Sequence, residues 1–314
     1  MDLLDRMNRA IDYVEQDITS ELNLPKLAQI THCSTYNFQR MFSMVTGISI
    51  TEYVRRRRLT LAALDLQQGD VKVIDISLKY GYDSPTSFAR AFQAVHGVTP
   101  REAKRSNVDL KAFPRMTFQM SITGTSEMNY RIVTTAPFKV FGVEELVSTT
   151  GEDYFQHGGK VWAQIWETNF SNGKYDQLKA AAGDGKPVNH SALFVQDMWQ
   201  IHALMNYRKV DDTTYGYMQC AFVGDDSKVD GYTVVEIPET TWAIFPTGMM
   251  PWDELGAAID EVYKRFYSEW LPTSEFESVS GPEFEMHSGN LEQGNIELWM
   301  PVQKRARDGG DEGL

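Results

Sequence analysis

Residues 84–96 join an apolar helix face to a row of polar and cationic side chains. Apolar residues recur there at spacings of three and four, and such residues share one buried face of a helix. They are Phe88, Ala91, Phe92 and Val95. The side chains predicted to face outward are Thr86, Ser87, Arg90 and Gln93. Because arginine can pair with guanine, glutamine with adenine and small polar groups with phosphates, this composition indicates a recognition helix that reads double-stranded DNA.

The residues around this helix predict how it is positioned. Ser84 is a favoured helix cap and Pro85 fits the first helical position, so the helix starts there. Gly97 ends it. A short apolar pattern precedes the helix, and Gly81 supplies the tight turn between the two. These signals predict a helix-turn-helix unit over residues 74–106.

The same pattern occurs fifty positions earlier in the chain. The residues that match at one constant offset are Ser34, Phe38, Arg40, Phe42, Val45 and Gly47, opposite Ser84, Phe88, Arg90, Phe92, Val95 and Gly97. A repeat without gaps indicates that one structural unit occurs twice. Residues 34–46 are therefore the predicted first recognition helix. Its expected DNA-binding residues are Ser34, Thr35, Asn37, Gln39 and Arg40, and those of the second helix are Ser84, Thr86, Ser87, Arg90 and Gln93.

A continuous helical pattern over residues 51–68 joins the two units and is predicted to act as a stiff spacer. Two recognition helices on one chain enter successive major grooves only when they are held about 34 Å apart, one turn of the duplex. Within the spacer, arginine occupies positions 55–58. Consecutive helical residues point in directions about 100° apart, so at most one or two of these arginines can reach DNA. The others are expected to face solvent or to form salt bridges.

This arrangement resembles the DNA-binding domain of the AraC/XylS family of bacterial transcription regulators, and especially its MarA, SoxS and Rob subgroup. The residues that match the family signature are Gly81, Tyr82, Ser84, Phe88, Arg90, Phe92, Gly97, Thr99 and Pro100. The resemblance covers roughly the first third of the chain. It implies an all-α domain with two helix-turn-helix modules over residues 1–108. Promoter DNA and RNA polymerase are the partners that it implies.

The chain changes character after this first third. All seven Trp lie after residue 160. Several alternating apolar patterns predict strands, and two helical patterns lie among them. Strands interleaved with helices predict an α+β domain with a mostly antiparallel sheet. The predicted segments are a linker at 109–127, the α+β domain at 128–304 and a disordered tail at 305–314.

The closing strand of this domain carries a carboxylate beside an indole. Alternate residues of a strand share a face, so Glu297 and Trp299 project together. Glu285 precedes them on what is predicted to be the neighbouring strand. A carboxylate among aromatic rings attracts lipophilic cations by charge and by cation–π contact, while apolar walls give breadth of recognition. These residues therefore suggest a pocket for a small amphiphilic molecule.

The second part of the chain resembles a GyrI-like effector-binding domain. The segments that carry the resemblance are Glu236 to Pro238, Trp242 to Phe245, Trp270 to Pro272, Pro282 to Glu285 and Ile296 to Val302. The resemblance implies a multidrug-sensing pocket in which Glu285 and Glu297 line the wall, with Trp299 beside Glu297. The other residues expected to bind the ligand are Trp162, Trp166 and Tyr217. His287 departs from the aromatic residue often found near that strand in relatives, which leaves the charge preference of the effector open.

Other roles for these residues remain open. Glu297 fits equally well as a surface acid on an edge strand, with the tryptophans as ordinary core, and the domain could be a protein-interaction module. A third interpretation is a hydrolase of small toxic electrophiles, in which Glu285 and either Tyr154 or Tyr217 would activate water. Against catalysis, the sequence contains no G-x-S-x-G, H-E-x-x-H or C-x-x-C motif. Fusion to a DNA-binding domain favours sensing, so a regulator that is not an enzyme is expected.

The charge of the chain is divided unevenly between its two parts. The formal net charge is −13. Residues 1–115 hold 16 Lys and Arg against 13 Asp and Glu, a net +3, whereas the remainder holds 14 against 30, a net −16. DNA contact is therefore expected to be confined to the first part.

The two cysteines, Cys33 and Cys220, are too few for a disulfide framework and are not spaced as metal ligands, so no metal or other cofactor is expected. The sequence shows no signal peptide and no run of 18 apolar residues. No contact with a membrane is expected, and the predicted location is the bacterial cytoplasm, in association with the nucleoid.

Overall fold

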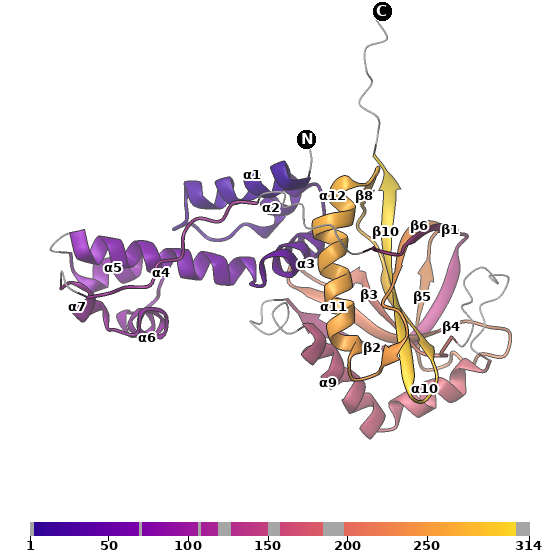
Figure 1. The fold of residues 1–314 in the computed structure, drawn as a ribbon. Helices are drawn as coiled ribbons and strands as arrows, with labels where there is room; N and C mark the ends of the chain where they lie inside the picture. The colour runs from indigo at the N-terminus through magenta and orange to yellow at the C-terminus, as the bar shows by residue number, and fades with distance from the viewer. Residues whose placement is uncertain are drawn as a thin grey trace, which may run out of the picture. The chain divides into compact units, whose positions relative to one another are not determined.

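A computed structural model describes residues 3–68, 71–105, 108–118, 127–149, 158–184 and 198–305 of the chain (Figure 1). The chain divides into two compact units. The first comprises Met1–His32 and Ile48–Ser121, and the second comprises Cys33–Gly47 and Ile122–Leu314. The short piece Cys33–Gly47 therefore belongs to the second unit. Among the described residues, no helix is long and apolar enough to cross a membrane.

The first unit is all-α. Its helices are α1 (Leu3–Gln16), α2 (Leu24–Thr31), α4 (Ile50–Gln68), α5 (Val73–Lys79), α6 (Pro85–His96) and α7 (Pro100–Ala103). One face of α4 forms a core with α5, α6 and α7. The buried residues of this core are Leu59, Ala62, Ala63, Leu66, Ile76, Tyr80, Phe88, Phe92, Val95 and Ala103. These contacts hold α5 and α6 as the second helix-turn-helix module.

The predicted start and end of α6 are confirmed. Ser84 adopts an extended backbone conformation and its Oγ accepts a hydrogen bond from the backbone N–H of Ser87 at 3.1 Å. This bond satisfies one of the unpaired N–H groups of the first turn. Gly97 ends the helix with φ +79° and Gly81 makes the preceding turn with the same φ. That left-handed conformation is open to glycine and unfavourable for most other residues.

The first part of the predicted linker is fixed to the first unit. Its backbone forms hydrogen bonds with side chains of α1 and α4 along its length. Phe113 N donates to Thr60 Oγ1 at 3.0 Å, Met116 N donates to the Tyr53 hydroxyl at 3.2 Å, and Phe118 N donates to Asn8 Oδ1 at 2.8 Å. The segment has no helical or strand period because it is an extended strap bound to helices. Residues 119–126 of the predicted linker lie outside the described part of the chain.

The second unit contains a ten-stranded sheet in which all the strand pairs are antiparallel. Its main path runs β1-β6-β10-β9-β3-β4-β2-β5, with β7 and β8 paired to β10. The strands are β1 (Arg131–Thr135), β2 (Phe138–Ser148), β3 (His202–Lys209), β4 (Thr214–Phe222), β5 (Thr233–Ile237), β6 (Thr240–Pro246), β7 (Met250–Pro251), β8 (Phe276–Ser278), β9 (Glu283–Gly289) and β10 (Gln293–Lys304). This architecture confirms the predicted α+β fold class.

Helices lie on one face of this sheet (Figure 1). They are α3 (Thr35–Thr46), α9 (Gly158–Ser171), α10 (Lys174–Ala182) and α11 (Leu255–Arg265). The helix α11 continues as the π-helical turn η2 (Phe266–Trp270) and the short α12 (Leu271–Thr273). The other sheet face forms a separate aromatic core around Trp242, Phe284 and Trp299.

Gly142 marks a point where two strands approach closely. A Cβ atom at this position would collide with the backbone oxygen of Gln219 and lie 2.8 Å from the Cα atom of Cys220. Gly142→Ala should therefore destabilise the second unit by more than about 2 kcal/mol, because sheet backbone cannot move aside without breaking its ladder. Thermal unfolding followed by tryptophan fluorescence would measure this, since every Trp lies in the second unit. Gly281→Ala is the control, because its Cβ would meet only Pro301 at 3.9 Å, and equal Tm values for the two variants would contradict the prediction.

Candidate functional site

The surface of α6 presents the predicted DNA-binding residues to solvent. Phe88 and Phe92 are fully buried in the module core. On the opposite face the exposed side chains are Thr86, Ser87, Arg90 and Gln93. Ser84, the fifth predicted residue of this helix, is half-buried and acts as its cap. Hydroxyl, amide and guanidinium groups on one exposed helix face can reach phosphates and base edges.

The four consecutive arginines of α4 are engaged within the first unit. Arg55 and Arg56 both pair with Glu52. Arg57 forms a two-pronged ion pair with Glu15, and the Arg58 guanidinium donates to backbone carbonyl oxygens. The Arg57 hydrogen bonds hold the pKa of Glu15 below its usual range, against the effect of burial. The expectation of salt bridges in this run is confirmed, and the run ties α4 to the end of α1.

The first recognition helix, α3, is buried where the sequence predicted a DNA-facing surface. Every residue from Thr35 to Ser43 is buried. The exposed fractions of Thr35, Asn37, Gln39 and Arg40 are 5%, 2%, 3% and 3%. Ser34, which is half-buried, caps the helix by accepting from Asn37 N at 3.1 Å. The prediction that these four side chains face outward is therefore wrong for this structure.

The reason is that α3 packs as a structural element of the second unit. Tyr36 lies in a core with residues of β2, β3 and β4, and its ring centroid is 4.8 Å from that of Tyr215. The hydroxyls of Thr35 and Tyr215 are hydrogen-bonded at 2.6 Å. Asn206 Nδ2 donates to Asn37 Oδ1 at 3.0 Å. These bonds satisfy polar groups that burial would otherwise penalise.

Arg40 is the cation at the centre of this contact. Its Nη1 lies 3.4 Å from Glu283 Oε2, and both side chains are almost fully buried. The same nitrogen donates to the Tyr36 hydroxyl. The guanidinium carbon lies 3.8 Å from the ring centroid of Tyr263 on α11, a close cation–π geometry. Arg40 therefore joins α3 to both the sheet and α11.

A cavity of about 340 Å³ opens between α3, α9, α11 and the helix-covered sheet face. Aromatic and apolar side chains form most of its wall. They include Met44, Trp162, Trp166, Phe170, Trp199, Trp252, Leu255, Ile259 and Ile296. Its polar groups are Arg40, Asp260, Tyr263, Glu285 and His287. A mostly apolar cavity with a few convergent polar groups is the usual form of a small-molecule site.

Glu285 is the carboxylate of this cavity. It lies on β9, and its Oε1 accepts a hydrogen bond from the Tyr263 hydroxyl at 3.1 Å. Burial raises the pKa of Glu285 to about 7, although nearby Arg40 and the Tyr263 hydrogen bond oppose the shift. Burial likewise raises the pKa of Asp260 and of Glu283. Burial therefore disfavours the charged form of all three acids.

The two histidines near β9 are neutral. Burial lowers the pKa of His287 to about 4 and that of His202 to about 3. His202 Nδ1 accepts a hydrogen bond from the His287 backbone N–H at 3.1 Å. His287 contacts Trp166 edge-on, with 5.0 Å between ring centroids. It therefore contributes a polar but uncharged surface to the cavity at neutral pH.

Trp162 and Trp166 line the cavity, and Tyr217 lies directly behind them. The rings of Trp162 and Tyr217 are stacked with 4.4 Å between centroids, and Trp166 Nε1 donates to the Tyr217 hydroxyl at 2.6 Å. Tyr217 thus orients both indoles. The alternative in which Tyr217 assists Glu285 in activating water is not favoured, because Glu285 accepts from Tyr263 instead. Tyr154, the other predicted partner, lies outside the described residues.

Glu297 and Trp299 do not reach this cavity, so their predicted place beside Glu285 is wrong. In the register of β9 and β10, Glu285 pairs with Leu298. The neighbours of Leu298 in the strand must then project from the opposite sheet face. There both Glu297 oxygens accept from the Arg131 guanidinium, at 2.8 and 2.6 Å, and Trp299 Nε1 donates to Glu297 Oε2 at 3.1 Å. Glu297 is a paired structural acid.

Sequence patterns missed the contributions of α3 and α11 to the cavity. Asp260 and Tyr263 are three residues apart on α11, and with Gly256 and Ile259 they form one helix face that lines the cavity. That spacing was visible in the sequence, although nothing in it showed which face meets a pocket. Nothing in the sequence indicated that Arg40 lines a pocket. It matches Arg90 in the repeat, and Arg90 is a surface residue.

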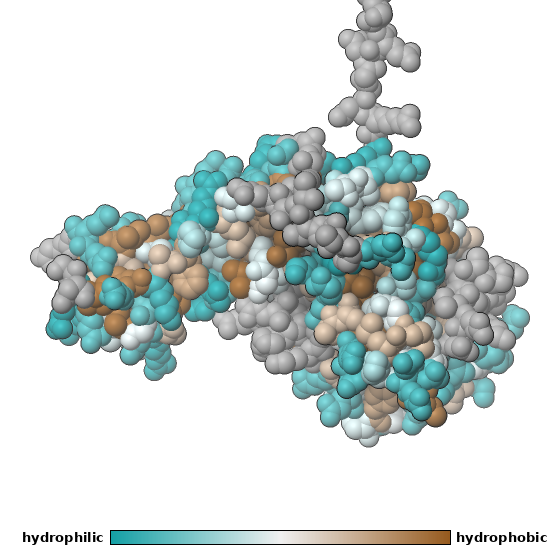
Figure 2. Space-filling view, viewed as in Figure 1, coloured by the Kyte–Doolittle hydropathy of each residue, from teal (hydrophilic) through white to brown (hydrophobic). Residues whose placement is uncertain are grey.

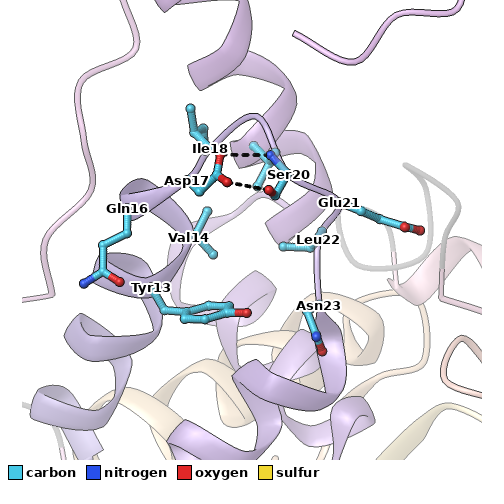
Figure 3. Close-up of a pocket in the computed structure, with 10 residues that line it drawn as sticks. Tyr13, Val14, Gln16, Asp17, Ile18, Ser20, Glu21, Leu22 and Asn23 are labelled. Atoms are coloured by element: carbon cyan, nitrogen blue, oxygen red, sulfur yellow. Dashed lines mark hydrogen bonds between the residues drawn. The ribbon is translucent and has the colours of Figure 1, made fainter. Parts of the chain in front are cut away.

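A second hollow, of about 190 Å³, lies in the first unit between the end of α1 and the start of α2 (Figure 3). One of its acids, Asp17, accepts hydrogen bonds from the residues that follow it in the chain. Asp17 accepts from Ser20 N and Oγ at 3.2 and 2.5 Å, and Thr19 Oγ1 donates to Asp17 at 2.8 Å. This is the bonding of a helix-ending turn. Among the described residues, no group of three His, Cys, Asp or Glu is placed to hold a metal ion.

Comparison with known proteins matches two separate parts of the chain to two different families. A profile of helix-turn-helix domains matches residues 27–106. The transcriptional activator AarP of Providencia stuartii is 41% identical over 88 residues, which are 28% of this chain and 65% of AarP. The regulatory protein SoxS of Salmonella typhimurium is 35% identical over 92 residues, which are 29% of this chain and 86% of SoxS.

The second part matches a different family. The family described as integron-associated effector binding protein matches residues 131–302, more than half of the chain. A solved structure of SAV2435 bound to tetraphenylphosphonium is 18% identical, covers 56% of this chain and 94% of its own, and has a TM-score of 0.42. The chain therefore belongs to the AraC-type family of helix-turn-helix transcription regulators, and it carries a GyrI-like, integron-associated effector-binding domain.

Proposed function

We propose that this regulator binds promoter DNA through the exposed surface of α6, and that its aromatic cavity binds a small amphiphilic cation. The observation that carries the second proposal is a buried carboxylate, Glu285, among the indoles of Trp162 and Trp166. A hydrophobic cation loses free energy of hydration when it enters such a cavity. Attraction to the Glu285 carboxylate and cation–π contact with the indoles would offset that loss. A neutral molecule would supply no charge to the Glu285 carboxylate.

The role of α6 in DNA binding is tested by changing Arg90 to Ala. Loss of one guanidinium at the DNA surface should weaken binding by about 1–3 kcal/mol and lower the salt dependence of affinity by about one charge. Binding would be measured by fluorescence anisotropy on duplexes selected from a randomised pool by the full chain. Arg208→Ala is the matched control, since Arg208 is half-exposed on β3 and pairs with Glu144. If affinity and salt slope both stayed at wild-type values, α6 would not be the DNA-reading face.

The charge preference of the cavity is tested with tetraphenylphosphonium and tetraphenylborate, which match in size and differ in charge. Because the pKa of Glu285 is about 7, its carboxyl gains charge between about pH 6 and 8, so cation affinity should rise by up to about tenfold over that range. His287 and His202 stay neutral there, while Arg40 stays charged. Tryptophan fluorescence would report binding to the second unit alone.

Glu285→Gln should abolish this rise and weaken cation binding. Asp260→Asn should keep the rise but move it to lower pH, because burial is the main cause of the raised pKa of Glu285 and the Asp260 charge adds to it. Glu144→Gln, which removes an acid from an ion pair elsewhere on the sheet, is the matched control. Stronger binding of tetraphenylborate than of tetraphenylphosphonium to the wild type would overturn the cationic assignment.

We also propose that the protein senses its ligand rather than converting it, and that it contacts RNA polymerase. Support for a protein contact comes from α5, where Ile74 and Leu78 are four residues apart and 48% and 61% exposed. Hydrophobic surface interrupts the hydrophilic surface over the region of α4 and α5 (Figure 2). Leu78→Ser should leave duplex affinity unchanged and reduce transcription in a purified polymerase assay. Full transcription by this variant would remove α5 as the contact.

A further inference from the structure

Arg40 places a positive charge in the wall of the cavity. It lines the wall together with Asp260, Tyr263 and Glu285, and it pairs with Glu283 at 3.4 Å behind them. Its guanidinium lies over the Tyr263 ring. An aromatic ring and a cluster of buried acids are also the groups that would hold an effector cation. The helix that supplies this arginine is the predicted first recognition helix.

The hydrogen bonding of the Arg40 guanidinium is incomplete. Among the described residues, Arg40 Nε has no hydrogen-bond partner although it is buried, and Glu283 Oε2 has none either. The ion pair at 3.4 Å is therefore a contact between charges without a well-formed hydrogen bond. Three acids, Asp260, Glu283 and Glu285, surround this one cation, and burial raises the pKa of each. A cationic ligand would stabilise the charged forms of these acids, which burial disfavours.

We propose that Arg40 serves as the cavity's internal cation, and that a cationic effector competes with it for the acids and the Tyr263 ring and so releases α3 for DNA. This inference rests on the proposed function, in which the cavity takes a cation and the chain reads DNA. The groups of α3 that could contact bases are engaged inside the second unit: Thr35 with Tyr215, Asn37 with Asn206, and Arg40 with Glu283. They cannot make those bonds and bind DNA at once.

Competition between Arg40 and the effector for the same acids couples effector binding to the release of α3. A ligand shifts an equilibrium only by its differential affinity for the two states. A cation meets an unscreened cluster of acids when Arg40 has left, and a like charge when Arg40 is present. The equivalent residue of the second module, Arg90, is exposed in the same structure. One module is then available without effector and two with it, so the effector should raise both the affinity for DNA and the salt dependence of binding.

The first experiment compares the two matched probes on the full chain. Arg40→Met should bind tetraphenylphosphonium about tenfold more tightly than the wild type, a difference of about 1.4 kcal/mol, and tetraphenylborate more weakly. Unchanged or weaker cation affinity in Arg40→Met would overturn the competition, as would unchanged affinity for tetraphenylborate. Absence of cation binding in every variant, by contrast, would refute the proposed effector class itself. Far-ultraviolet circular dichroism and Tm would confirm that Arg40→Met is folded.

The second experiment leaves α3 unaltered and weakens its partners. Tyr215→Phe removes the bond to Thr35, and Glu283→Gln removes the charge opposite Arg40. Each variant should bind the selected duplexes, without any probe, as tightly and with as steep a salt slope as the wild type does with tetraphenylphosphonium. Glu144→Gln should behave as the wild type. If neither variant gained affinity while the wild type still bound DNA and cation, the release of α3 would be wrong and the proposed function would stand.

Discussion

The buried contact of Arg40 with Glu283 and the Tyr263 ring is the interaction on which the arrangement of α3 depends. It joins one helix to both β9 and α11, the elements that carry the acids of the cavity. Removing one member of such a buried pair typically costs about 3–5 kcal/mol, because the remaining charge loses its partner in a medium of low polarity. The same contact therefore holds α3 in place and sets the charge balance of the cavity.

Local signals in the sequence predicted the second module well. The cap at Ser84, the turn at Gly81, the stop at Gly97 and the buried face containing Phe88 are all as expected, because each depends on residues within one turn of the backbone. The repeat also located α3 correctly along the chain. The repeat did not predict which side chains are exposed. Arg40 and Arg90 occupy the same position in it, but Arg40 is buried and Arg90 is exposed. Sequence periodicity cannot reveal which face of a helix a distant segment will cover.

The cavity shows the same limit. Alternation along β10 correctly paired Glu297 with Trp299 on one face, and Glu297 accepts a hydrogen bond from that indole. The prediction that Glu285 shares their pocket required the register between β9 and β10, which pairs Glu285 with Leu298 and so separates the two acids by the thickness of the sheet. Trp162 and Trp166, which were expected to bind the ligand, line the cavity. Tyr263 and Asp260 were missed because only the packing of α11 gives their face a role.

The difference in burial between α3 and α6 has a consequence for how such a protein can change over generations. A substitution on the exposed face of α6 changes side chains that lie in solvent. A substitution at Thr35, Asn37 or Arg40 alters contacts with the second unit as well. The two halves of the repeat therefore face unequal selection: under the proposed function, promoter preference can change through the second half alone, whereas a change in the first half must also preserve the walls of the cavity.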